Sequence, residues 1–448
     1  MTHPAPGATT TVETPDGPVV AHRNARVMRA HGVPYATAER FQPPVAPEPW
    51  TAPHEGTPGP LSPQLPDALL TAVDPGYAER QGLDEHCQFL SVTWPADAPD
   101  DGRTGQGLPV VVWIHGGSYA TGGGELPAYD PALLVEEQRV IVVSITYRLG
   151  VLGFLGDGAT APANLGLLDI IAALAWVQRS ISAFGGDPDR VTAMGQSAGA
   201  DAIASLLATE HAGTLFQRAI LQSTPLGIAR GREPMTAAML RAAGPVAPDA
   251  PVAEVLDAQA SASKAARTHG LTSLMPFGPQ WGHAPLPPEA ERDALTANAA
   301  GVDVMIGHLA DEGALVGMRY PGLRRAFALP GIGRALHRVT AGALARAVYE
   351  RPAAQFARAH REAGGRAIQY SLRWRAEGSP MMDGHGMDLP LLLGDPESWA
   401  AASILGDESA ERILEVGRAV RGVWGDFIRT GDVAAVSAAR APVLTIQD

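Results

Sequence analysis

The sequence predicts an α/β fold with one large, mostly parallel central sheet and helices on both faces. Two apolar runs without alternation, Leu108–Ile114 and Val140–Tyr147, have the length and composition of strands covered on both sides. The stretch Asn164–Phe184 repeats apolar residues every three or four positions, as an amphipathic helix does. A further apolar run, Arg190–Met194, follows it. Strand, helix and strand in this order form the parallel unit of a doubly wound sheet.

The N-terminal part of the chain predicts antiparallel structure. Thr9–Glu13 and Val19–His22 flank the turn residues Pro15–Gly17, which favours a hairpin. Between Thr51 and Gly82 the composition shifts to Pro, Gly and Ala, which indicates a surface loop with at most one short helix. We expect the next strand over Glu85–Val92.

Composition restricts the classes of partner. The chain has 448 residues, a net charge of −13, 46% hydrophobic residues and 18% charged residues, which is typical of a folded globular protein. The negative charge argues against a nucleic acid or an anionic membrane as partner. The longest apolar runs are too short to cross a bilayer, so we expect no membrane insertion. No metal cluster or phosphate-binding loop is evident, and we expect no metal and no cofactor.

Two features bear on the compartment. The first ten residues lack the basic and apolar regions of a secretory signal, although a signal that had been removed would leave the same pattern. Cys87 is the only cysteine, which excludes an intramolecular disulfide and fits a reducing compartment. The sequence thus favours a cytoplasmic protein.

A candidate nucleophile lies in the segment Val191–Gly199, which reads VTAMGQSAG. Its end matches the pattern G-x-S-x-G, in which a serine occupies a strained turn between a strand and a helix. Such a pattern is weak alone in a chain with 50 glycines, so its context decides. A strand-like run precedes Ser197 and a helix-like stretch follows it. We therefore predict that Ser197 is a nucleophile.

A second glycine-rich segment follows the predicted strand Leu108–Ile114. His115–Tyr119 reads HGGSY, and glycines directly after a buried strand leave backbone N–H groups uncovered. Such donors can form an oxyanion hole, which binds the negative oxygen of a tetrahedral intermediate. The alternative is a plain glycine turn with an exposed His115. The order of strand, glycines and serine turn favours the oxyanion hole.

These motifs resemble those of the type-B carboxylesterases, which include the cholinesterases and the bacterial p-nitrobenzyl-type esterases. The resemblance covers Thr11 to Ser223 almost without gaps, and weaker matches extend to Gly431. It is carried by the segments GVPYA, RFQPP, DEHCQFLSV, VVVWIHGGS, YRLGVLGFL, NLGLLD, AWVQ, FGGDPDRVT, GQSAGA and LFQRAILQS. It implies an α/β-hydrolase fold and the hydrolysis of a small-molecule ester by a Ser-His-Glu triad.

The resemblance also indicates where the acid of the triad lies. The family places it in a G-x-x-x-D-E-G segment, and Gly307–Gly313 matches this pattern after the expected strand Val302–Ile306. Glu312 is the residue that corresponds, and the adjacent Asp311 is the alternative. The carboxylate would fix the tautomer of the histidine and stabilise its cationic form.

The histidine of the triad is expected in Gly384–Pro390, which fits the family pattern H-x-x-E/D. The preceding Ile368–Trp374 alternates with a period of two, so a strand would deliver this loop. His385 would accept the proton of the serine hydroxyl. The chain order Ser, Glu, His is the order expected of this fold. The alternatives near other motifs are His115, His283 and His308.

Three backbone N–H groups would hold the oxyanion. They belong to Ala198, which follows the nucleophile, and to Gly117 and Ser118 in the glycine-rich segment. Ser118 stands where the family usually has glycine or alanine. Gln196 replaces the glutamate that many relatives carry beside the serine, which removes a negative charge from the floor of the pocket.

The resemblance implies further structural features. Arg40 with Glu85, and Arg148 with Asp169, would form partly buried ion pairs, and ordinary surface charges are the alternative. Cys87 occupies a position at which secreted relatives form a disulfide. Because no second cysteine exists, we expect a free, buried thiol.

Substrate contacts are expected from Gln196 and from four apolar residues, with simple core packing as the alternative for the apolar ones. The four apolar residues are Leu226, Met275, Phe277 and Trp281. The loop Thr51–Gly82 contains no tryptophan, so a cation–π site for choline esters is not evident. Esters with short to medium acyl chains, or aryl esters, are the expected substrates.

We interpret residues 1–448 as one catalytic domain, in which 226–300 and 318–366 are insertions that form a cap over the substrate cleft. The basic, helix-like stretch Gly322–Arg361 lies within the second insertion. A monomer or a weak homodimer is expected. Two other functions stay open, namely an amidase or carbamate hydrolase with the same triad, and a non-catalytic binding module, which would need no intact triad.

Overall fold

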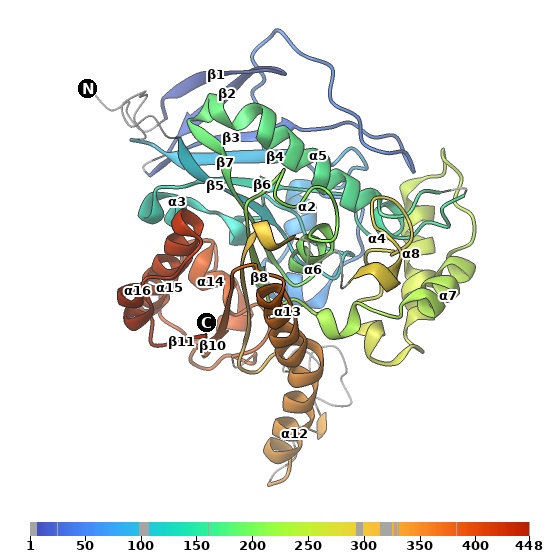
Figure 1. Ribbon diagram of the computed structural model, residues 1–448. Coiled ribbons are helices and arrows are strands. Elements are labelled where there is room, and N and C mark those ends of the chain that lie inside the picture. Colours follow the sequence, from blue (N-terminus) through green and yellow to red (C-terminus); the bar gives the residue numbers. More distant parts are fainter. Residues whose placement is uncertain are drawn as a thin grey trace.

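The computed structural model describes residues 7–24, 26–97, 107–159, 161–292, 299–313, 325–326, 329, 331–381 and 383–447. A large twisted sheet with helices packed around it forms the body of the molecule (Figure 1). Within the described ranges the sheet has eleven strands, in the order β1-β2-β3-β4-β6-β5-β7-β8-β9-β10-β11. The strands are β1 (Thr9–Thr14), β2 (Gly17–Arg23), β3 (Val27–Pro34), β4 (Phe89–Pro95), β5 (Leu108–Ile114), β6 (Ile141–Ile145), β7 (Gly186–Gln196), β8 (Arg218–Gln222), β9 (Asp303–Leu309), β10 (Ala367–Leu372) and β11 (Leu444–Gln447).

The centre of the sheet is parallel and both of its ends are antiparallel. Strands β6, β5, β7, β8, β9 and β10 run parallel to one another. Strands β1 to β4 form an antiparallel meander that joins this centre through β4 and β6, and β11 adds antiparallel to β10. The predicted hairpin at the N-terminus and the predicted parallel centre are both confirmed.

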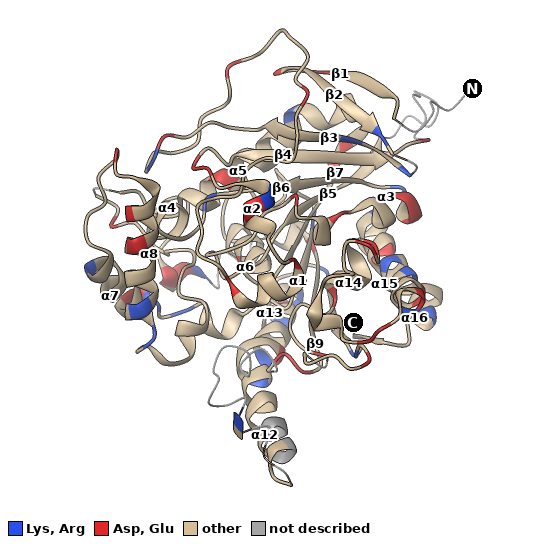
Figure 2. Ribbon diagram, turned by 180° about the vertical axis from the view of Figure 1, so that it is seen from behind, with Lys and Arg blue, Asp and Glu red and all other residues tan. Residues whose placement is uncertain are grey.

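Strand β5 shows why the sheet needs helices on both faces. Val110, Val112 and Ile114 belong to one buried cluster, whereas the alternate residues Val111 and Trp113 belong to a second cluster on the opposite face. All five side chains are at most 1% exposed. Because neither β5 nor β6 contains a charged residue, these two strands are apolar on both faces. Charged residues of both signs lie on the outer elements (Figure 2).

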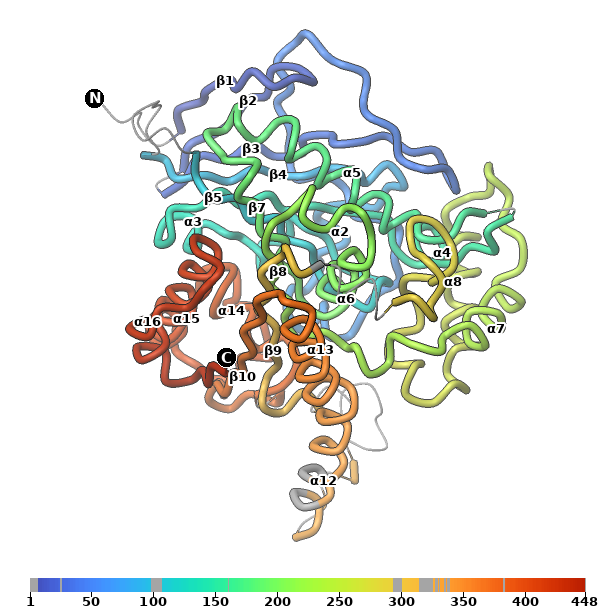
Figure 3. Tube along the Cα trace, in the orientation of Figure 1, coloured from blue at the N-terminus to red at the C-terminus, as the bar shows by residue number. Residues whose placement is uncertain are grey.

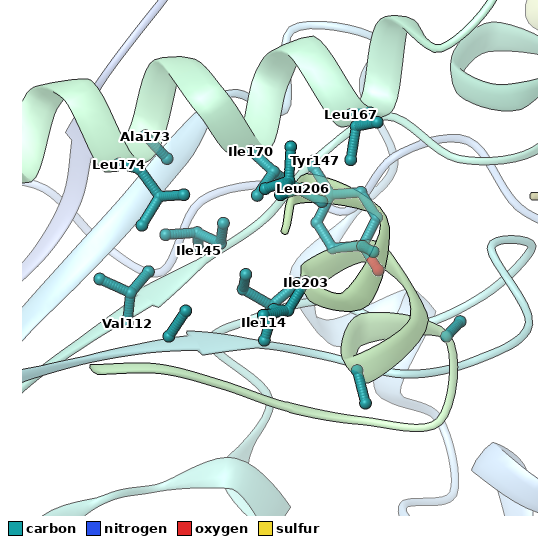
Figure 4. Packing of buried hydrophobic residues seen from close by; sticks show 14 of the residues in the cluster. Val112, Ile114, Ile145, Tyr147, Leu167, Ile170, Ala173, Leu174, Ile203 and Leu206 are labelled. Carbon is teal, nitrogen blue, oxygen red and sulfur yellow. The ribbon is translucent and has the colours of Figure 1, made fainter. Parts of the chain in front are cut away.

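Helix α5 (Leu165–Ser180) covers the first face. Leu167, Ile170 and Leu174 point from it toward the strands, as Figure 4 shows, and all three are fully buried. With the 3-10 turn η2 (Ile181–Phe184) it forms a segment that is long and apolar enough to cross a membrane by length and composition alone. In this fold that apolar surface packs against the sheet.

The opposite face is covered by segments far apart in the chain. Helix α15 (Ala410–Thr430) lies beside α3 (Ala132–Gln138), as the tube in Figure 3 shows. The Arg421 guanidinium donates two hydrogen bonds of 2.8 Å to the carboxylate of Glu137. The remaining helices of the body are α1 (Ala68–Val73), α2 (Tyr77–Gln81), η1 (Pro127–Tyr129), α4 (Gly150–Phe154), α6 (Ala198–Leu206), η6 (Ala299–Gly301), α14 (Leu389–Leu392), η8 (Ser403–Leu405) and α16 (Ala435–Arg440).

Two local predictions are wrong. The segment 51–82 contains two short helices, α1 and α2, where at most one is expected. Helix α1 forms because the Asp67 side chain accepts hydrogen bonds from the N–H groups of Leu69 and Leu70 and so caps its first turn. The strand expected from Glu85 begins only at Phe89, because the backbone before it turns: His86 N–H donates to Oδ1 of Asp84, and Phe89 N–H donates to the Cys87 carbonyl.

The predicted ion pairs and the free thiol are confirmed. Arg40 and Glu85 are mostly buried, and Arg148 and Asp169 are at most 2% exposed. Asp169 accepts hydrogen bonds from the backbone N–H and from two guanidinium nitrogens of Arg148. Cys87 is a free, buried cysteine, and burial raises the pKa of its thiol.

The two predicted insertions contain mainly helices. Helix α12 (Gly333–Ala345) projects from the body of the molecule (Figure 1). Residues 293–298 of the first insertion, and 318–324, 327–328 and 330 of the second, lie outside the described residues. Their role as a cap stays a prediction. The elements are η3 (Leu226–Ile228), α7 (Glu233–Ala243), α8 (Val252–Ala266), η4 (Gly270–Leu274), η5 (Glu289–Glu291), α12 (Gly333–Ala345), η7 (Arg346–Glu350) and α13 (Arg351–Glu362).

Candidate active site

Ser197 occupies the turn between the end of β7 and the start of α6. Its backbone has φ +56° and ψ −120°, a conformation that residues with a side chain rarely adopt and that costs about 1–3 kcal/mol. Two hydrogen bonds hold the turn: Ser197 N–H donates to the Gln222 carbonyl at 2.8 Å, and Asp201 N–H donates to the Ser197 carbonyl at 3.0 Å. The sharp turn presents the hydroxyl at the carboxyl end of the central strands.

The two glycines of the motif are required by close backbone contacts. A Cβ on Gly195 would lie 2.6 Å from the carbonyl carbon of Gly199. A Cβ on Gly199 would clash with the carbonyl oxygen of Ile114, at the end of the neighbouring strand β5. The chain can therefore pass from β7 into α6 this close to β5 only with glycine at both positions.

Glu312 and His385 form a buried pair. Glu312 follows β9, and its Oε1 accepts a hydrogen bond of 2.9 Å from Leu309 N–H. Its Oε2 lies 2.6 Å from Nδ1 of His385, in the loop between β10 and α14. Asp311 N–H donates to the Asp383 carbonyl at 3.1 Å, which joins the two loops. Of the two neighbouring acids, Glu312 is thus the one whose carboxylate meets the imidazole.

The pair shifts both pKa values in the direction that favours charge. Burial alone would lower the pKa of His385, but the charge and the hydrogen bond of Glu312 outweigh burial and raise it. Burial alone would raise the pKa of Glu312, but His385 outweighs it and lowers that pKa. Asp388 also favours the cationic imidazole, and the ring of Tyr349 lies 5.4 Å from the imidazole.

The contacts of His385 with Glu312 and with Gln196 agree on which ring nitrogen carries the proton. The side-chain nitrogen of Gln196 lies 3.2 Å from Nε2 of His385. An amide nitrogen only donates, so this contact requires Nε2 to accept, and the proton of the neutral ring then sits on Nδ1, facing Glu312. This tautomer leaves Nε2 basic. Gln196 is 5% exposed and reaches the site from the residue before Ser197.

The glycine-rich loop after β5 has an unusual backbone. Gly117, Ser118 and Tyr119 have φ of +108°, +56° and +57° in succession. The Gly117 carbonyl accepts hydrogen bonds from the N–H groups of Ala120 and Thr121, so this carbonyl faces the interior of the loop. Within the described parts of the chain, the N–H groups of Gly117 and Ser118 donate no hydrogen bond.

The same loop closely approaches the serine turn. A Cβ on Gly116 would lie 3.2 Å from Cβ of Ser197 and 2.7 Å from Oε1 of Gln196. Ala198 is the first residue of α6, so its N–H has no acceptor within the helix. The structure therefore brings Gly117, Ser118 and Ala198, the three predicted donors, to the surroundings of Ser197.

The alternative histidines have other partners. His115 is fully buried, stacks on Tyr147 with ring centroids 4.4 Å apart, and donates from Nδ1 to the Gly116 carbonyl. Burial lowers its pKa to about 4, so it is neutral. His308 contacts the Leu309 carbonyl, and His283 lines a separate cavity. The predicted exposure of His115 in the plain-turn alternative is thus wrong.

Sequence reasoning did not single out Asp388, which lies three residues after His385. It is 1% exposed, and Gln222 at the end of β8 donates a hydrogen bond of 2.6 Å to its Oδ2. Burial, aided by the charge of Glu312, raises the pKa of Asp388 to about 6. The signal was available, because Asp388 is the acidic position of the H-x-x-E/D pattern.

The predicted substrate-contact residues occupy two environments. Met275 and Phe277 are at most 2% exposed and pack in the core, and Leu226 is partly buried against the same cluster. Trp281 lines a cavity of about 230 Å³ between α7 and the segment 279–289, with the Arg292 guanidinium 4.6 Å from its ring. None of the three residues Ser197, Glu312 and His385 lines that cavity. Substrate contact by these residues stays a prediction.

The described residues contain no group of three or more His, Cys, Asp or Glu side chains that could hold a metal ion.

The family model of the carboxylesterase family matches residues 8–323. The chain belongs to the carboxylesterase family. It is a carboxylic-ester hydrolase with the α/β-hydrolase fold, and the predicted resemblance to p-nitrobenzyl esterases and cholinesterases is confirmed.

Two curated relatives illustrate the relationship. This carboxylesterase is 36% identical over 434 residues to the probable N-octanoylanthranilate hydrolase of Rhodococcus erythropolis, a match that covers 95% of this chain and 94% of the relative. It is 38% identical over 322 residues to the para-nitrobenzyl esterase of Bacillus subtilis, which covers 68% of this chain and 63% of that relative.

Solved structures agree with the fold. A thermophilic PNB esterase superposes with a TM-score of 0.76 at 28% identity, over 96% of this carboxylesterase and 92% of that chain. A carboxylesterase of Geobacillus stearothermophilus superposes with a TM-score of 0.74 at 27% identity, over the same shares of the two chains.

Proposed function

We propose that this carboxylesterase hydrolyses esters through an acyl-enzyme on Ser197, with His385 as general base and Glu312 as the carboxylate that orients it. The observation that carries the proposal is the 2.6 Å contact between Nδ1 of His385 and Oε2 of Glu312 in a fully buried pair. This contact leaves Nε2 as the basic atom, and Nε2 faces the side chain of Gln196, the residue before Ser197.

The reaction would proceed in two matching steps. The Ser197 Oγ attacks the ester carbonyl carbon while Nε2 of His385 takes the hydroxyl proton. The bond from carbon to the alcohol oxygen then breaks, and the imidazolium returns the proton to that oxygen. A water molecule attacks the acyl-enzyme in the same way and releases the carboxylic acid and Ser197. The negative charge of Glu312 stabilises the imidazolium in both steps.

The tetrahedral oxyanion would be bound by the N–H groups of Gly117, Ser118 and Ala198. Support comes from the successive positive φ angles of the glycine-rich loop and from its close approach to Ser197. One such donor is typically worth about 3–4 kcal/mol of activation free energy.

We propose esters with short to medium acyl chains, or aryl esters, as the substrate class. The relatives named para-nitrobenzyl esterase and PNB esterase support an aryl or benzyl alcohol portion. Comparison of kcat/KM for p-nitrophenyl acetate, butyrate, octanoate and palmitate tests the acyl portion. Equal or higher kcat/KM for palmitate contradicts it.

A second candidate is hydrolysis of an N-acyl aromatic amide by the same triad. The relative that matches almost the whole chain is named a probable N-octanoylanthranilate hydrolase, and its substrate contains an amide. Turnover of N-octanoylanthranilate beside that of an octanoyl ester of matched size decides between the two. A higher kcat/KM for the amide favours this second function.

The experiment that tests the nucleophile is covalent labelling. A fluorophosphonate should react with one serine, and mass spectrometry should place the label on the peptide that contains Ser197. Ser197→Ala should abolish both the label and p-nitrophenyl butyrate hydrolysis. Ser205→Ala, in helix α6 and also buried, is the matched control and should keep both. Retained hydrolysis in Ser197→Ala refutes the proposed mechanism.

A further inference from the structure

The last residue of the glycine-rich segment connects that segment to the helix that follows Ser197. Tyr119 follows Ser118 directly, and its side chain is completely buried. Its hydroxyl donates a hydrogen bond of 2.8 Å to Oδ2 of Asp201. Asp201 lies in the first turn of α6, and its own N–H donates to the carbonyl of Ser197. One hydrogen bond therefore joins the two segments that meet at the nucleophile.

We propose that Tyr119 and Asp201 are positioning residues, whose hydrogen bond holds the N–H groups of Gly117 and Ser118 at the distance from Ser197 that the oxyanion requires. This inference rests on the proposed function, because it gives the bond a purpose only if those N–H groups bind an oxyanion. Neither side chain touches the reacting atoms.

The backbone of the loop explains why such a bond is needed. Ser118 and Tyr119 both have left-handed φ values although neither is glycine. Each such residue costs about 1–2 kcal/mol, so the loop would relax if nothing held it. The Tyr119 carbonyl accepts from Gly150 N–H at 2.6 Å, and the Tyr119 ring lies 4.3 Å from that of Phe154. These contacts fix the backbone and the ring, and the hydroxyl adds the connection to α6.

Asp201 is an unusual choice for a position that is 1% exposed. Of its two carboxylate oxygens, Oδ2 accepts the hydrogen bond from the Tyr119 hydroxyl. The other oxygen, Oδ1, has no hydrogen-bond partner within the described chain. The positive charges of Arg292 and Arg232 act on the carboxylate, and Arg232 itself donates to the carbonyls of Ile228 and Pro276. A buried carboxylate is expensive to keep, which argues that its bond to Tyr119 serves the site.

Three variants separate the bond from the rest of the residues. Tyr119→Phe removes only the hydroxyl and keeps the contact with Phe154. Asp201→Ala removes the acceptor. Asp201→Asn keeps an oxygen that can accept from the tyrosine hydroxyl, so it is the conservative variant. Tyr35→Phe is the matched control, because Tyr35 is equally buried and donates a bond of 2.7 Å to the Thr146 carbonyl, which lies outside this loop.

The measurements are kcat and KM for p-nitrophenyl butyrate and the affinity for a trifluoromethyl ketone, whose tetrahedral adduct needs the oxyanion donors. We expect Tyr119→Phe and Asp201→Ala to lower kcat and ketone affinity together by about 10-fold or more, with KM within about twofold. The double variant Tyr119→Phe with Asp201→Ala should lose no more kcat and ketone affinity than the poorer single variant, because both changes remove the same bond. Asp201→Asn and Tyr35→Phe should stay near wild type.

The outcomes distinguish this inference from the proposed function. Unchanged kcat and ketone affinity in a folded Tyr119→Phe variant overturn the positioning role. A loss of thermal stability with unchanged ketone affinity overturns it too, since a merely structural bond would show that result. Wild-type enzyme that is not labelled at Ser197 by the fluorophosphonate instead refutes the proposed mechanism itself.

Discussion

The side-chain amide nitrogen of Gln196 lies 3.2 Å from Nε2 of His385, so a neutral hydrogen-bond donor faces the atom that would take the proton of Ser197. A donor in this place stabilises the unprotonated Nε2 and disfavours the imidazolium. The amide has to give way when the serine proton arrives.

Gln196→Glu should therefore raise the pKa that limits activity at low pH. A carboxylate at the same position attracts the imidazolium instead of opposing it, so the acid limb of kcat/KM should move up by about one pH unit. Gln196→Met, which removes the donor without adding charge, is the control and should move the limb less. An acid limb that stays in place in Gln196→Glu contradicts the assigned contact.

In the wild-type enzyme, kcat/KM should rise with pH through a pKa above 6.5. The base works only when neutral, and Glu312 raises the pKa of His385, so the proton is lost at a higher pH than from a free histidine. Rates measured from pH 5 to 9 give this value. A profile that is flat over pH 5 to 8 contradicts His385 as the base.

Glu312→Gln should lower kcat by about two to four orders of magnitude and shift the remaining acid limb downward. The carboxylate raises the pKa of His385 against the effect of burial, so without that carboxylate burial dominates and the pKa falls. An acid limb that moves upward in this variant shows that Glu312 does not act on the base.

Gly199→Ala should lower the free energy of unfolding by more than about 2 kcal/mol and reduce activity, because its methyl group would clash with the backbone of β5. The matched control is Gly422→Ala in helix α15, where a Cβ would have no neighbour within 4 Å. That variant should gain about 0.5–1 kcal/mol. Equal stability of the two variants, measured by denaturant unfolding, contradicts the close packing described for the serine turn.

Asp388→Asn should become more stable relative to wild type as the pH rises from 4 to 7. The native carboxyl has a pKa of about 6, above its ordinary 3.8, so the native state binds more protons than the unfolded state and wild type loses stability over this interval. The relative gain is about 3 kcal/mol at most, by 1.4 kcal/mol per pKa unit. Melting temperatures of both proteins between pH 4 and 7 test it, and a constant difference contradicts the raised pKa.

The sequence predicted well those features that depend on short patterns. Strand β5, helix α5 and the serine turn follow from unbroken apolar runs, a helical period and two glycines. At most one short helix is expected where α1 and α2 form, because only a capping side chain on α1 and a few buried residues stabilise these helices within a segment rich in turn-forming residues.

Contacts between distant residues could not be read from one sequence. The resemblance to the family located Glu312 and His385, but nothing local showed that Gln196 would reach Nε2, 189 residues away in the chain. The Tyr119 to Asp201 bond likewise depends on how β5 and β7 lie side by side. Such pairings become visible only when the sheet has brought its strand ends together.

The Arg148 and Asp169 pair has a consequence for how this sequence can change over time. Each side chain is enclosed by the protein, and the two charges meet through two hydrogen bonds from the guanidinium, to which the Arg148 backbone N–H adds a third. Loss of one partner leaves an unpaired ion buried away from water, which destabilises the fold by about 3–5 kcal/mol. Exchange of both for well-packed apolar residues can leave stability unchanged. Descendants of this enzyme are therefore expected to keep both charges or to replace them together, and a lineage with only one of them should be rare.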